Sequence, residues 1–250
     1  MKKKSPERAS EGGDLPLFFA PGFLETLTLP EEESRHASRV LRLTEGESIL
    51  VTDGAGALYR AELTEVSPKA AVFALGEEIL SSPRTTPHLH LAVAPTKNMD
   101  RIEWLLEKMV EVGLSKFTLL STERTVRRHV NLDRLKKVMI SALKQSRKRF
   151  VTEINECRSV EALFSEIDRT VTRGAYIGYC SDEFPKTPIT SAFQKGTPSL
   201  FLIGPEGDFT PEEVRTAVSF GAVPVTLGEE RLRTETAGLY AGVLHAVLNS

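Results

Sequence analysis

Cysteine is scarce in this sequence of 250 residues, and Cys157 and Cys180 are the only two. Two thiols make neither a disulfide framework nor a Cys/His zinc site, so both are expected to be reduced and no metal is expected. Long hydrophobic runs are also missing. No apolar stretch approaches the ~18 residues that a membrane span needs, and Lys2-Lys3-Lys4 is followed by polar residues rather than a signal-peptide segment. These absences exclude a disulfide-rich secreted domain and predict a cytoplasmic protein.

Three common phosphate-binding or nucleophile motifs are absent as well. No Gly-rich loop ends in Lys-Ser/Thr and no GxGxxG occurs, so neither a P-loop nor a dinucleotide fingerprint explains the polar loops of this chain. There is no nucleophile elbow, and the histidines are scattered at His36, His88, His90, His129 and His245. Ser-His-Asp hydrolysis therefore has no support in the sequence.

The net charge of −2 is unevenly distributed along the chain. Residues 97–149 hold 14 Lys and Arg against 6 Asp and Glu, a local charge of +8, whereas residues 1–96 carry −4 and residues 150–250 carry −6. A basic stretch in an otherwise acidic protein indicates a polyanionic partner. Solvated faces of ordinary helices would explain the same charges equally well.

The first part of the chain has the pattern of a small β-rich domain. Residues 1–14 are polar without periodicity and are expected to be a disordered tail. Short apolar runs follow over residues 15–82, and Asp53-Gly54-Ala55-Gly56 supplies the positive-φ residues that a hairpin loop needs. With one helix near Glu31–Leu41, this region predicts a small barrel or sandwich rather than βαβ units. The prolines of Ser81–Pro87 mark the domain boundary.

Strands and helices alternate over residues 86–250. Asn98 can cap a helix whose apolar residues recur at helical spacing up to Gly113, and a second amphipathic helix is expected from about Leu132 to Gln145. Strands are expected at Leu89–Ala94, Phe117–Leu120, Ala175–Tyr179 and Ser199–Ile203. This alternation predicts an α/β domain with a mainly parallel sheet covered on both faces.

The sharpest local feature follows the strand that ends at Ile203. The segment Gly204-Pro-Glu-Gly-Asp208 is a glycine-bracketed turn. After it, Thr210 suits a helix N-cap, Pro211 the first helical position and Glu213 a capping box. Ligands of open α/β sheets bind beyond the carboxyl ends of the strands, where this turn would lie.

A second polar glycine loop follows the next strand, Val225–Leu227. It begins at Gly228 and carries Arg231, Arg233 and Glu235 into the following helix. Because the two loops leave successive strands of one sheet, they are expected to form one pocket.

At these loops the sequence resembles a known family. The motifs that carry the resemblance are, in order, Lys97...Asp100-Arg101...Glu103, Lys108...Glu111-Val-Gly113, Thr122-Glu-Arg-Thr125, Ile203-Gly-Pro-Glu-Gly207 and Leu227-Gly...Arg231-Leu-Arg-Thr-Glu-Thr-Ala237. Together they resemble the RsmE family of 16S rRNA uridine-N3 methyltransferases. His36...Arg39-Val-Leu-Arg-Leu43 and the Asp53-Gly54 hairpin are similar to that family's PUA-like RNA-binding barrel. The resemblance covers essentially everything after residue 14.

The resemblance implies a SPOUT fold working as a homodimer. A PUA-like β-barrel (residues 15–82) would precede an α/β domain (residues 86–250) whose C-terminal part is threaded into a trefoil knot. The cofactor would be S-adenosyl-L-methionine, held largely by backbone groups of the two loops. The implied cofactor-binding residues are Leu202, Ile203, Gly204, Pro205, Gly207, Leu227, Gly228, Arg231, Leu232 and Arg233. The closing helix, Ala237–Leu248, would pack at the dimer interface. Its stripe of Ala237, Tyr240, Leu244 and Val247 would fit an intramolecular core equally well.

Methyl transfer is a displacement at the sulfonium methyl, so the enzyme has to align donor and acceptor and help to remove the uracil N3 proton. Glu206 and Glu235 are the candidate proton acceptors, and Arg233 or Arg231 could stabilise the anionic uracil or hold its phosphate. Glu206 could instead stabilise its turn by a hydrogen bond, and Glu235 could be an early-helix residue favoured by the helix dipole.

The substrate would be 16S rRNA of the small ribosomal subunit, lying along the basic stretch. The candidates for phosphate contact are Arg39, Arg42, Arg124, Arg127, Arg128, Arg147 and Arg149, with Lys144 and Lys148 beside them. His36 could join them or be a structural histidine.

The sequence departs from many members of the family at Arg147 and Asp208, where glycine is common. Arginine cannot enter a left-handed turn as freely as glycine, so the local geometry near the pocket is in question. Two alternative functions stay open: a SPOUT methyltransferase acting on another RNA nucleotide, and a non-catalytic RNA-binding or ribosome-assembly protein that keeps the fold.

Overall fold

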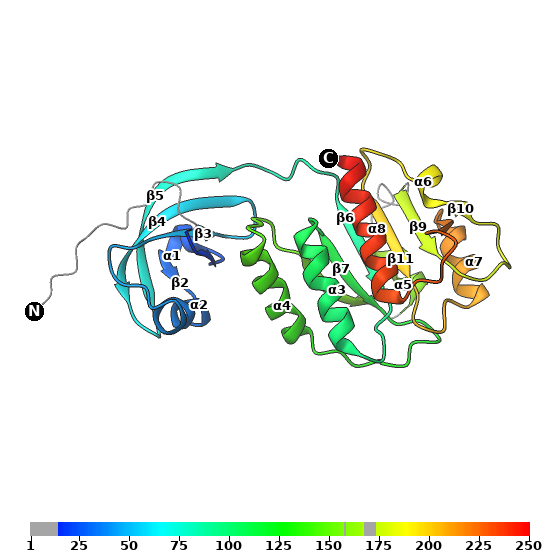
Figure 1. Ribbon diagram of the computed structural model, residues 1–250, viewed down its shortest axis with the longest axis horizontal. Helices are drawn as coiled ribbons and strands as arrows, with labels where there is room; N and C mark the ends of the chain where they lie inside the picture. Colours follow the sequence, from blue (N-terminus) through cyan, green and yellow to red (C-terminus); the bar gives the residue numbers. More distant parts are fainter. Residues whose placement is uncertain (1–14, 158, 168–173) are drawn as a thin grey trace, which may run out of the picture. The chain divides into compact units, whose positions relative to one another are not determined.

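The structure is a computed structural model that describes residues 15–157, 159–167 and 174–250, so the tail expected over residues 1–14 lies outside the described part. The chain divides into two compact units, residues 1–82 and 83–250 (Figure 1).

The N-terminal unit is a five-stranded sheet with the order β1-β3-β4-β5-β2. Only β1 and β3 pair in parallel, and the other neighbours are antiparallel. Its elements are β1 (Leu17–Phe19), α1 (Phe23–Thr26), β2 (Thr28–Leu29), α2 (Glu31–Arg35), a π-helical turn (His36–Val40), β3 (Ser48–Thr52), β4 (Ala57–Val66) and β5 (Ala71–Ser81). Phe18, Phe23 and Phe73 fill its core.

Two local expectations for this unit are confirmed. Asp53 Oδ1 accepts hydrogen bonds from the amides of Ala55 (2.7 Å) and Ala57 (3.1 Å), and Gly54 and Gly56 have φ angles of 77° and 123°. Positive φ is available to glycine at no steric cost, so this loop joins β3 to β4 as predicted. The single helix expected near Glu31–Leu41 is present in two parts, because the α-helical turns of α2 give way to a π-helical turn at His36.

The second unit is a seven-stranded parallel sheet with the order β10-β12-β9-β11-β6-β7-β8. Its strands are β6 (Leu89–Val93), β7 (Lys116–Leu120), β8 (Glu153–Cys157), β9 (Ala175–Gly178), β10 (Thr187–Pro188), β11 (Ser199–Ile203) and β12 (Val223–Thr226). Its helices are α3 (Met99–Glu111), α4 (Leu132–Gln145), α5 (Val160–Glu166), α6 (Ile189–Ala192), α7 (Pro211–Ser219) and α8 (Thr234–Asn249). The central strands β6 and β11 are buried along their whole length, as expected for parallel strands covered on both faces.

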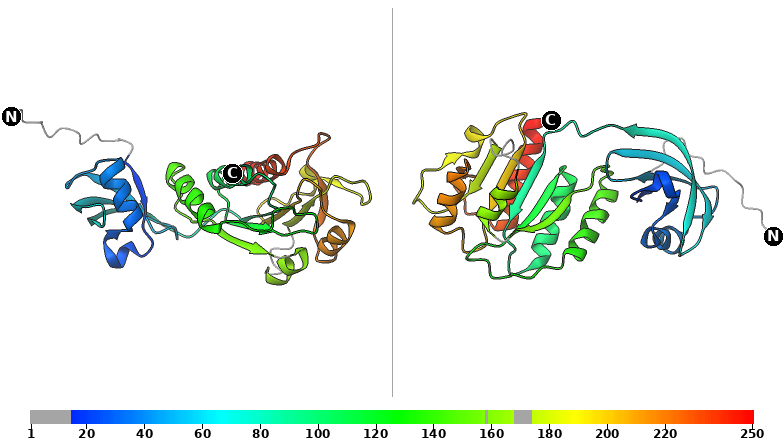
Figure 2. Two further views of the ribbon diagram at one scale, coloured as in Figure 1. Left: turned by 90° about the horizontal axis from the view of Figure 1, so that it is seen from below. Right: turned by 180° about the vertical axis from the view of Figure 1, so that it is seen from behind.

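Helices cover both faces of this sheet. Helices α3, α4 and α8 lie on one face and share a core with Leu91, Phe117 and Phe201, whereas α5 and α7 cover the other face over Ile177 and Leu202 (Figure 2). After β12 the chain returns across the sheet, so that α8 packs against α3, β6 and β11. Among the described residues there is no helix with the length and apolar character needed to span a bilayer.

The helix starts that the sequence predicted are confirmed by their caps. Asn98 Oδ1 accepts from the amide of Asp100 at the start of α3, and α4 has the bounds expected from its periodicity. At α7 the Thr210 hydroxyl accepts from the amide of Glu213, and the Glu213 carboxylate accepts from the amide of Thr210. This reciprocal pair satisfies two amides that the first helical turn leaves without partners.

The stripe predicted on the last helix, for a dimer interface or an intramolecular core, is only partly buried within the chain. The residues of α8 that face the core include Gly238, Ala241, Gly242 and His245, whereas Tyr240 is 43% and Val247 63% exposed. Ala237 and Leu244, the other two members of the expected stripe, are partly buried against the core. The two glycines decide the orientation, because a residue without a side chain lets α8 approach α3 closely: a Cβ at Gly238 would lie 3.0 Å from a methyl of Leu105.

Arg147 and Asp208 both adopt the left-handed conformation that glycine prefers, with φ angles of 54° and 63°. Asp208 lies in the turn after β11. Arg147 does not lie near that turn, which corrects the expectation from the sequence. It follows the C-terminal end of α4, directly before the chain enters the amino end of β8, whereas Asp208 lies at the carboxyl ends of the strands.

Replacing Arg147 with glycine is expected to raise the free energy of unfolding by about 0.5–1 kcal/mol, because the left-handed conformation is strained for arginine. Chemical denaturation of the two proteins would measure the difference. The matched control is Arg149→Gly, since Arg149 is not in this conformation and its guanidinium lies 5.0 Å from the ring centre of Phe150. A gain from Arg149→Gly as large as that from Arg147→Gly would contradict the explanation.

Candidate functional site

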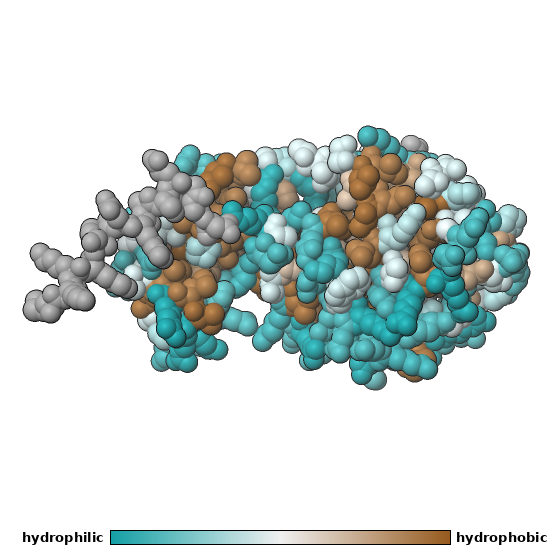
Figure 3. All heavy atoms as spheres, viewed as in Figure 1, coloured by the Kyte–Doolittle hydropathy of each residue, from teal (hydrophilic) through white to brown (hydrophobic). Residues whose placement is uncertain are grey.

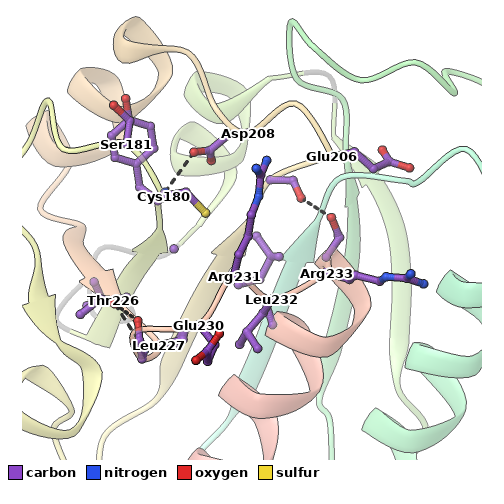
Figure 4. A pocket seen from close by; sticks show the side chains of 18 of the residues that line it. Cys180, Ser181, Glu206, Asp208, Thr226, Leu227, Glu230, Arg231, Leu232 and Arg233 are labelled. Atoms are coloured by element: carbon purple, nitrogen blue, oxygen red, sulfur yellow. Dashed lines mark hydrogen bonds between the residues drawn. The ribbon is translucent and has the colours of Figure 1, made fainter.

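A pocket of about 790 Å³ opens at the carboxyl ends of β9, β11 and β12. Its walls come from the segments that follow these strands, and Arg101 of α3 adds one side chain. In the view of Figure 4, the side chain of Arg231 lies between those of Asp208 and Glu206. The side chains of Glu206 and Arg233 both point to the right. The site therefore lies where parallel α/β sheets place their ligands.

The turn after β11, residues 204–208, is held from three directions. Glu206 Oε1 accepts from the amide of Lys97 (3.0 Å), Asp208 Oδ2 accepts from the amide of Cys180 (3.0 Å), and Thr234 Oγ1 donates to the carbonyl of Gly204 (3.0 Å). Loops after β6 and β9 and the start of α8 thus fix one turn, and its backbone forms a preorganised wall.

Gly204 suits this turn because Phe209 folds back closely over it. A Cβ at Gly204 would lie 3.1 Å from Cδ2 and 3.2 Å from the amide nitrogen of Phe209, closer than real Cβ contacts usually come. Phe209 itself is 1% exposed and belongs to the core. A larger residue at position 204 would require Phe209 to shift by a few tenths of an ångström.

Glu235 is the one buried carboxylate among the described residues that line the pocket. Its Oε1 lies 3.5 Å from Nη1 of Arg101, and its side chain is 11% exposed. Its Oε2 is buried without a hydrogen-bond partner in the described part of the protein. A buried acceptor without a partner costs free energy, which indicates that a ligand group completes its bonding.

The wall after β9 was not among the site residues expected from the sequence. It consists of Gly178, Tyr179, Cys180, Ser181, Asp182 and Lys186. Lys186 Nζ donates to the carbonyls of Cys180 and Ser181 and to Asp182 Oδ1, so it fixes the loop from inside. Burial raises the pKa of the Cys180 thiol and Asp208 adds to the effect, so the thiol stays protonated near neutral pH. The expected strand over Ala175–Tyr179 was a signal for this wall, because the carboxyl ends of parallel strands lie at the same edge of a sheet.

Two family models match this chain. One, an RNA methyltransferase domain, matches residues 83–246, and the other, an RNA methyltransferase PUA domain, matches residues 29–75. The first covers more than half of the chain. The chain belongs to this RNA methyltransferase family.

Relatives of the methyltransferase are similar over nearly their whole length. The ribosomal RNA small subunit methyltransferase E of Bacillus subtilis is 29% identical over 228 residues, which are 86% of this chain and 88% of the relative. The crystal structure of a probable rRNA-methyltransferase from Porphyromonas gingivalis is 35% identical with a TM-score of 0.85, covering 94% of this chain and 98% of that one. The ribosomal RNA small subunit methyltransferase E of Neisseria gonorrhoeae, bound to S-adenosyl methionine, is 26% identical with a TM-score of 0.77 over the same shares.

These likenesses confirm the resemblance to the RsmE family and the SPOUT fold with a small PUA-like domain before it. They leave the individual site residues as predictions, for which the structure of the methyltransferase gives only the positions.

Of the predicted site residues, the three candidate catalytic ones, Glu206, Arg233 and Glu235, all line the pocket. Eight predicted cofactor-binding residues line it too: Ile203, Gly204, Pro205, Leu227, Gly228, Arg231, Leu232 and Arg233. Leu202 does not, because it points into the core and has no exposed surface. Gly207 belongs to the same turn but faces the side chain of Arg124. Arg101 lines the pocket and was missed, although the motif that contains it was noted.

The structure does not bring the predicted RNA-contacting arginines of the methyltransferase domain together. Arg124, Arg127 and Arg128 follow β7 at the same edge of the sheet as the pocket. Arg147 and Arg149 lie at the opposite edge, before β8. Arg39 and Arg42 are exposed in the N-terminal unit, on and just after its π-helical turn.

Proposed function

We propose that this chain transfers a methyl group from S-adenosyl-L-methionine to N3 of a uridine in 16S rRNA of the small ribosomal subunit. We further propose that it does so in the cytoplasm and as a homodimer. The observation that carries the proposal is the pocket of the methyltransferase domain, with a carboxylate oxygen of Glu235 in its wall that is buried and has no hydrogen-bond partner among the described residues. The names of the relatives and the S-adenosyl methionine bound to one of them support the substrate and the cofactor.

The residues of the pocket fit this cofactor. Its volume of about 790 Å³ is in the range of small-molecule sites. Gly178, Gly204 and Gly228 lie at the ends of the three strands that border it, where backbone amides and carbonyls come close to a ligand. Ile203, Leu227 and Leu232 supply apolar surface for a flat ring. When bound, S-adenosyl-L-methionine supplies an electrophilic methyl group, and no metal is needed to activate it.

This chain has three tasks in the reaction: to hold the donor, to orient the uracil and to remove the N3 proton. The backbone of the two glycine loops performs the first. Arg231 and Arg233 suit the second, because a guanidinium can stabilise the negative charge that develops on the uracil oxygens. A carboxylate performs the third.

Glu235 is the better of the two candidate proton acceptors. Its buried Oε2 can take a proton, and its Oε1 stays close to Arg101. Glu206 is exposed and its Oε1 already accepts from the amide of Lys97, which supports the turn-stabilising role for that residue.

The test is transfer of labelled methyl from S-adenosyl-L-methionine to small ribosomal subunits from a strain that lacks this gene, followed by nucleoside mass spectrometry. N3-methyluridine at one position is the expected result. Another methylated nucleoside would keep the cofactor and overturn the substrate. No transfer to subunits, naked rRNA or tRNA would favour the non-catalytic RNA-binding alternative.

The homodimer is supported by an apolar surface on the outer side of α8. Tyr240, Val243 and Val247 are 43%, 40% and 63% exposed there, and Trp104 of the neighbouring helix α3 is 44% exposed. Figure 3 shows hydrophobic side chains gathered over this part of the domain. A contiguous apolar patch of this kind is typical of a protein interface.

Replacing Val247 with glutamate is expected to weaken the dimer by at least about tenfold, because a two-fold interface would contain the buried charge twice. Sedimentation equilibrium would measure the dissociation constant. Val218→Glu on α7 is the matched control, since Val218 is also exposed (41%) but lies on the opposite face of the sheet. A monomeric wild-type protein, or equal effects of the two variants, would speak against α8 as the interface.

A further inference from the structure

Two loops of the methyltransferase domain are joined by Arg124. This residue lies in the loop after β7, and its Nη1 donates to the carbonyls of Gly207 (2.8 Å) and Phe209 (3.3 Å) in the segment after β11. The aliphatic part of the same side chain packs over Gly207. A Cβ built on Gly207 would lie 3.4 Å from Cβ and 3.5 Å from Cδ of Arg124. In the same loop, the amide of the preceding residue, Glu123, donates a hydrogen bond to Glu213 Oε1 (2.9 Å).

The segment that Arg124 holds is the wall of the cofactor pocket. Gly204, Glu206 and Asp208 line the pocket, and the two carbonyls that Arg124 binds flank Asp208. Asp208 is in the strained left-handed conformation, and the Arg124 guanidinium holds the carbonyl of the residue on each side of it. The contact of Arg124 therefore fixes the strained part of the wall.

The base from which Arg124 projects is rigid. The amide of Thr122 donates to Thr125 Oγ1 (2.9 Å), the two threonine hydroxyls share a hydrogen bond (2.8 Å), and the amide of Thr125 donates to the carbonyl of Thr122 (3.1 Å). Both threonines are buried, at 3% and 4% exposure. A closed turn of this kind fixes the backbone from which the Arg124 side chain projects, so less conformational entropy is lost in the contact than from a flexible loop.

We propose that Arg124 is a positioning residue that holds the cofactor wall, and that it does not contact RNA phosphate as its place in the basic stretch suggested. All three arginines of this loop are exposed, but of the three only the Arg124 guanidinium is held by backbone carbonyls of the described residues, so the phosphate contacts of this loop belong to Arg127 and Arg128. This inference rests on the proposed function, because the wall is a cofactor wall only if S-adenosyl-L-methionine binds there.

The test compares Arg124→Ala, Arg124→Lys and the control R127A/R128A with the full-length wild-type protein. Calorimetry measures the Kd for S-adenosyl-L-methionine, and titration of 16S rRNA at several salt concentrations measures RNA affinity and its salt dependence. Arg124→Ala is expected to weaken cofactor binding about tenfold and to leave RNA binding without cofactor unchanged. R127A/R128A is expected to weaken RNA binding, with a shallower salt dependence, and to leave the affinity for S-adenosyl-L-methionine unchanged.

Arg124→Lys separates geometry from charge and serves also if the alanine variant fails to fold. Lysine keeps the positive charge but its side chain is one bond shorter, so it cannot reach both carbonyls from the same backbone. Cofactor binding weakened several-fold with normal RNA affinity is the expected result. Full restoration of cofactor affinity by lysine would overturn the proposal, as would a loss of RNA affinity in Arg124→Ala without a change in cofactor affinity.

Hydrogen exchange tests the anchoring by Arg124 separately from the proposed function. Without any ligand, the amides of residues 206–210 are expected to exchange faster in Arg124→Ala than in R127A/R128A. If the wild-type protein bound no S-adenosyl-L-methionine, the proposed function would fail while this measurement still tested the anchoring of the wall. Unchanged exchange in Arg124→Ala would overturn the anchoring itself.

Discussion

Replacing Glu235 with glutamine is expected to slow methyl transfer by about 10²- to 10⁴-fold, the range that a positioned general base contributes. Glutamine has nearly the same shape as glutamate and can still contact Arg101, but its amide cannot accept the N3 proton. The affinity for S-adenosyl-L-methionine is expected to change little, because the backbone of the glycine loops carries most of that binding. Single-turnover methyl transfer at saturating RNA and cofactor measures the chemical step directly.

Glu206→Gln is the matched control for this experiment. Both glutamates line the pocket, and the two substitutions are chemically identical. Since Glu206 is exposed and bonded to the amide of Lys97, its replacement is expected to reduce the rate by less than about tenfold through a small shift of the turn. A large loss for Glu206→Gln with a normal rate for Glu235→Gln would exchange the two roles. Normal rates for both variants would remove carboxylates from the proton transfer.

The parts of the fold that sequence predicted best depend on neighbouring residues alone. Asn98, the Thr210–Glu213 capping box and the Asp53–Gly56 loop were all read from short patterns, and each has the expected hydrogen bonds. A cap or a tight turn is stabilised within a few residues, so its signal is complete in the local sequence. The two pocket loops were found for the same reason.

The parts that sequence could not predict depend on contacts between distant segments. The orientation of α8 is one example: alanine, glycine, leucine and valine occur all around this helix, so periodicity could not tell its buried face from its exposed one. Packing of Gly238 and Gly242 against α3 decides it, and no rule of spacing contains that contact. The path of the chain after β12, which brings α8 back onto β6, was implied only by the family resemblance.

The role of Arg124 in the site also depends on a contact between distant segments, so it could not be predicted from the sequence. As one of a run of basic residues it was expected to bind phosphate, and its contact with carbonyls 83 and 85 positions further along the chain could not be deduced from charge. Charge patterning identifies the class of partner that a segment attracts, whereas the role of each arginine depends on what its own side chain reaches.

A buried polar network of the methyltransferase sheet predicts acid sensitivity. His90 on β6, Thr118 on β7 and Asn155 on β8 lie on adjacent strands, with 2.7 Å between His90 Nε2 and Thr118 Oγ1. The Thr118 hydroxyl donates its only hydrogen to Asn155 Oδ1 (2.6 Å), so it can only accept from His90. His90 therefore carries a proton on Nε2 and donates it to Thr118.

Protonation of His90 would place a charge in the core. Burial lowers the pKa of His90 to about 3, and the nearby Lys116 contributes in the same direction. The unfolded chain binds the proton near pH 6.5. Because the folded state then binds fewer protons than the unfolded state between pH 6.5 and pH 3, stability is lost as the pH falls through this window. The slope is about 1.4 kcal/mol per pH unit, so this histidine alone should cost about 2 kcal/mol at pH 5.

His90→Gln isolates this contribution, because an amide nitrogen can donate to Thr118 but does not titrate. At pH 7 the variant is expected to be less stable than the wild type by about 1–2 kcal/mol from imperfect packing. Between pH 7 and pH 5 it should lose about 2 kcal/mol less than the wild type, as measured by urea denaturation at each pH.

His245 keeps part of the acid sensitivity in both proteins, since burial lowers its pKa too. The control His88→Gln changes an exposed residue of the same type and should follow the wild-type curve. Parallel curves for His90→Gln and the wild type would mean that folding does not lower the pKa of His90, which would contradict the burial of a neutral His90 as the source of the acid sensitivity.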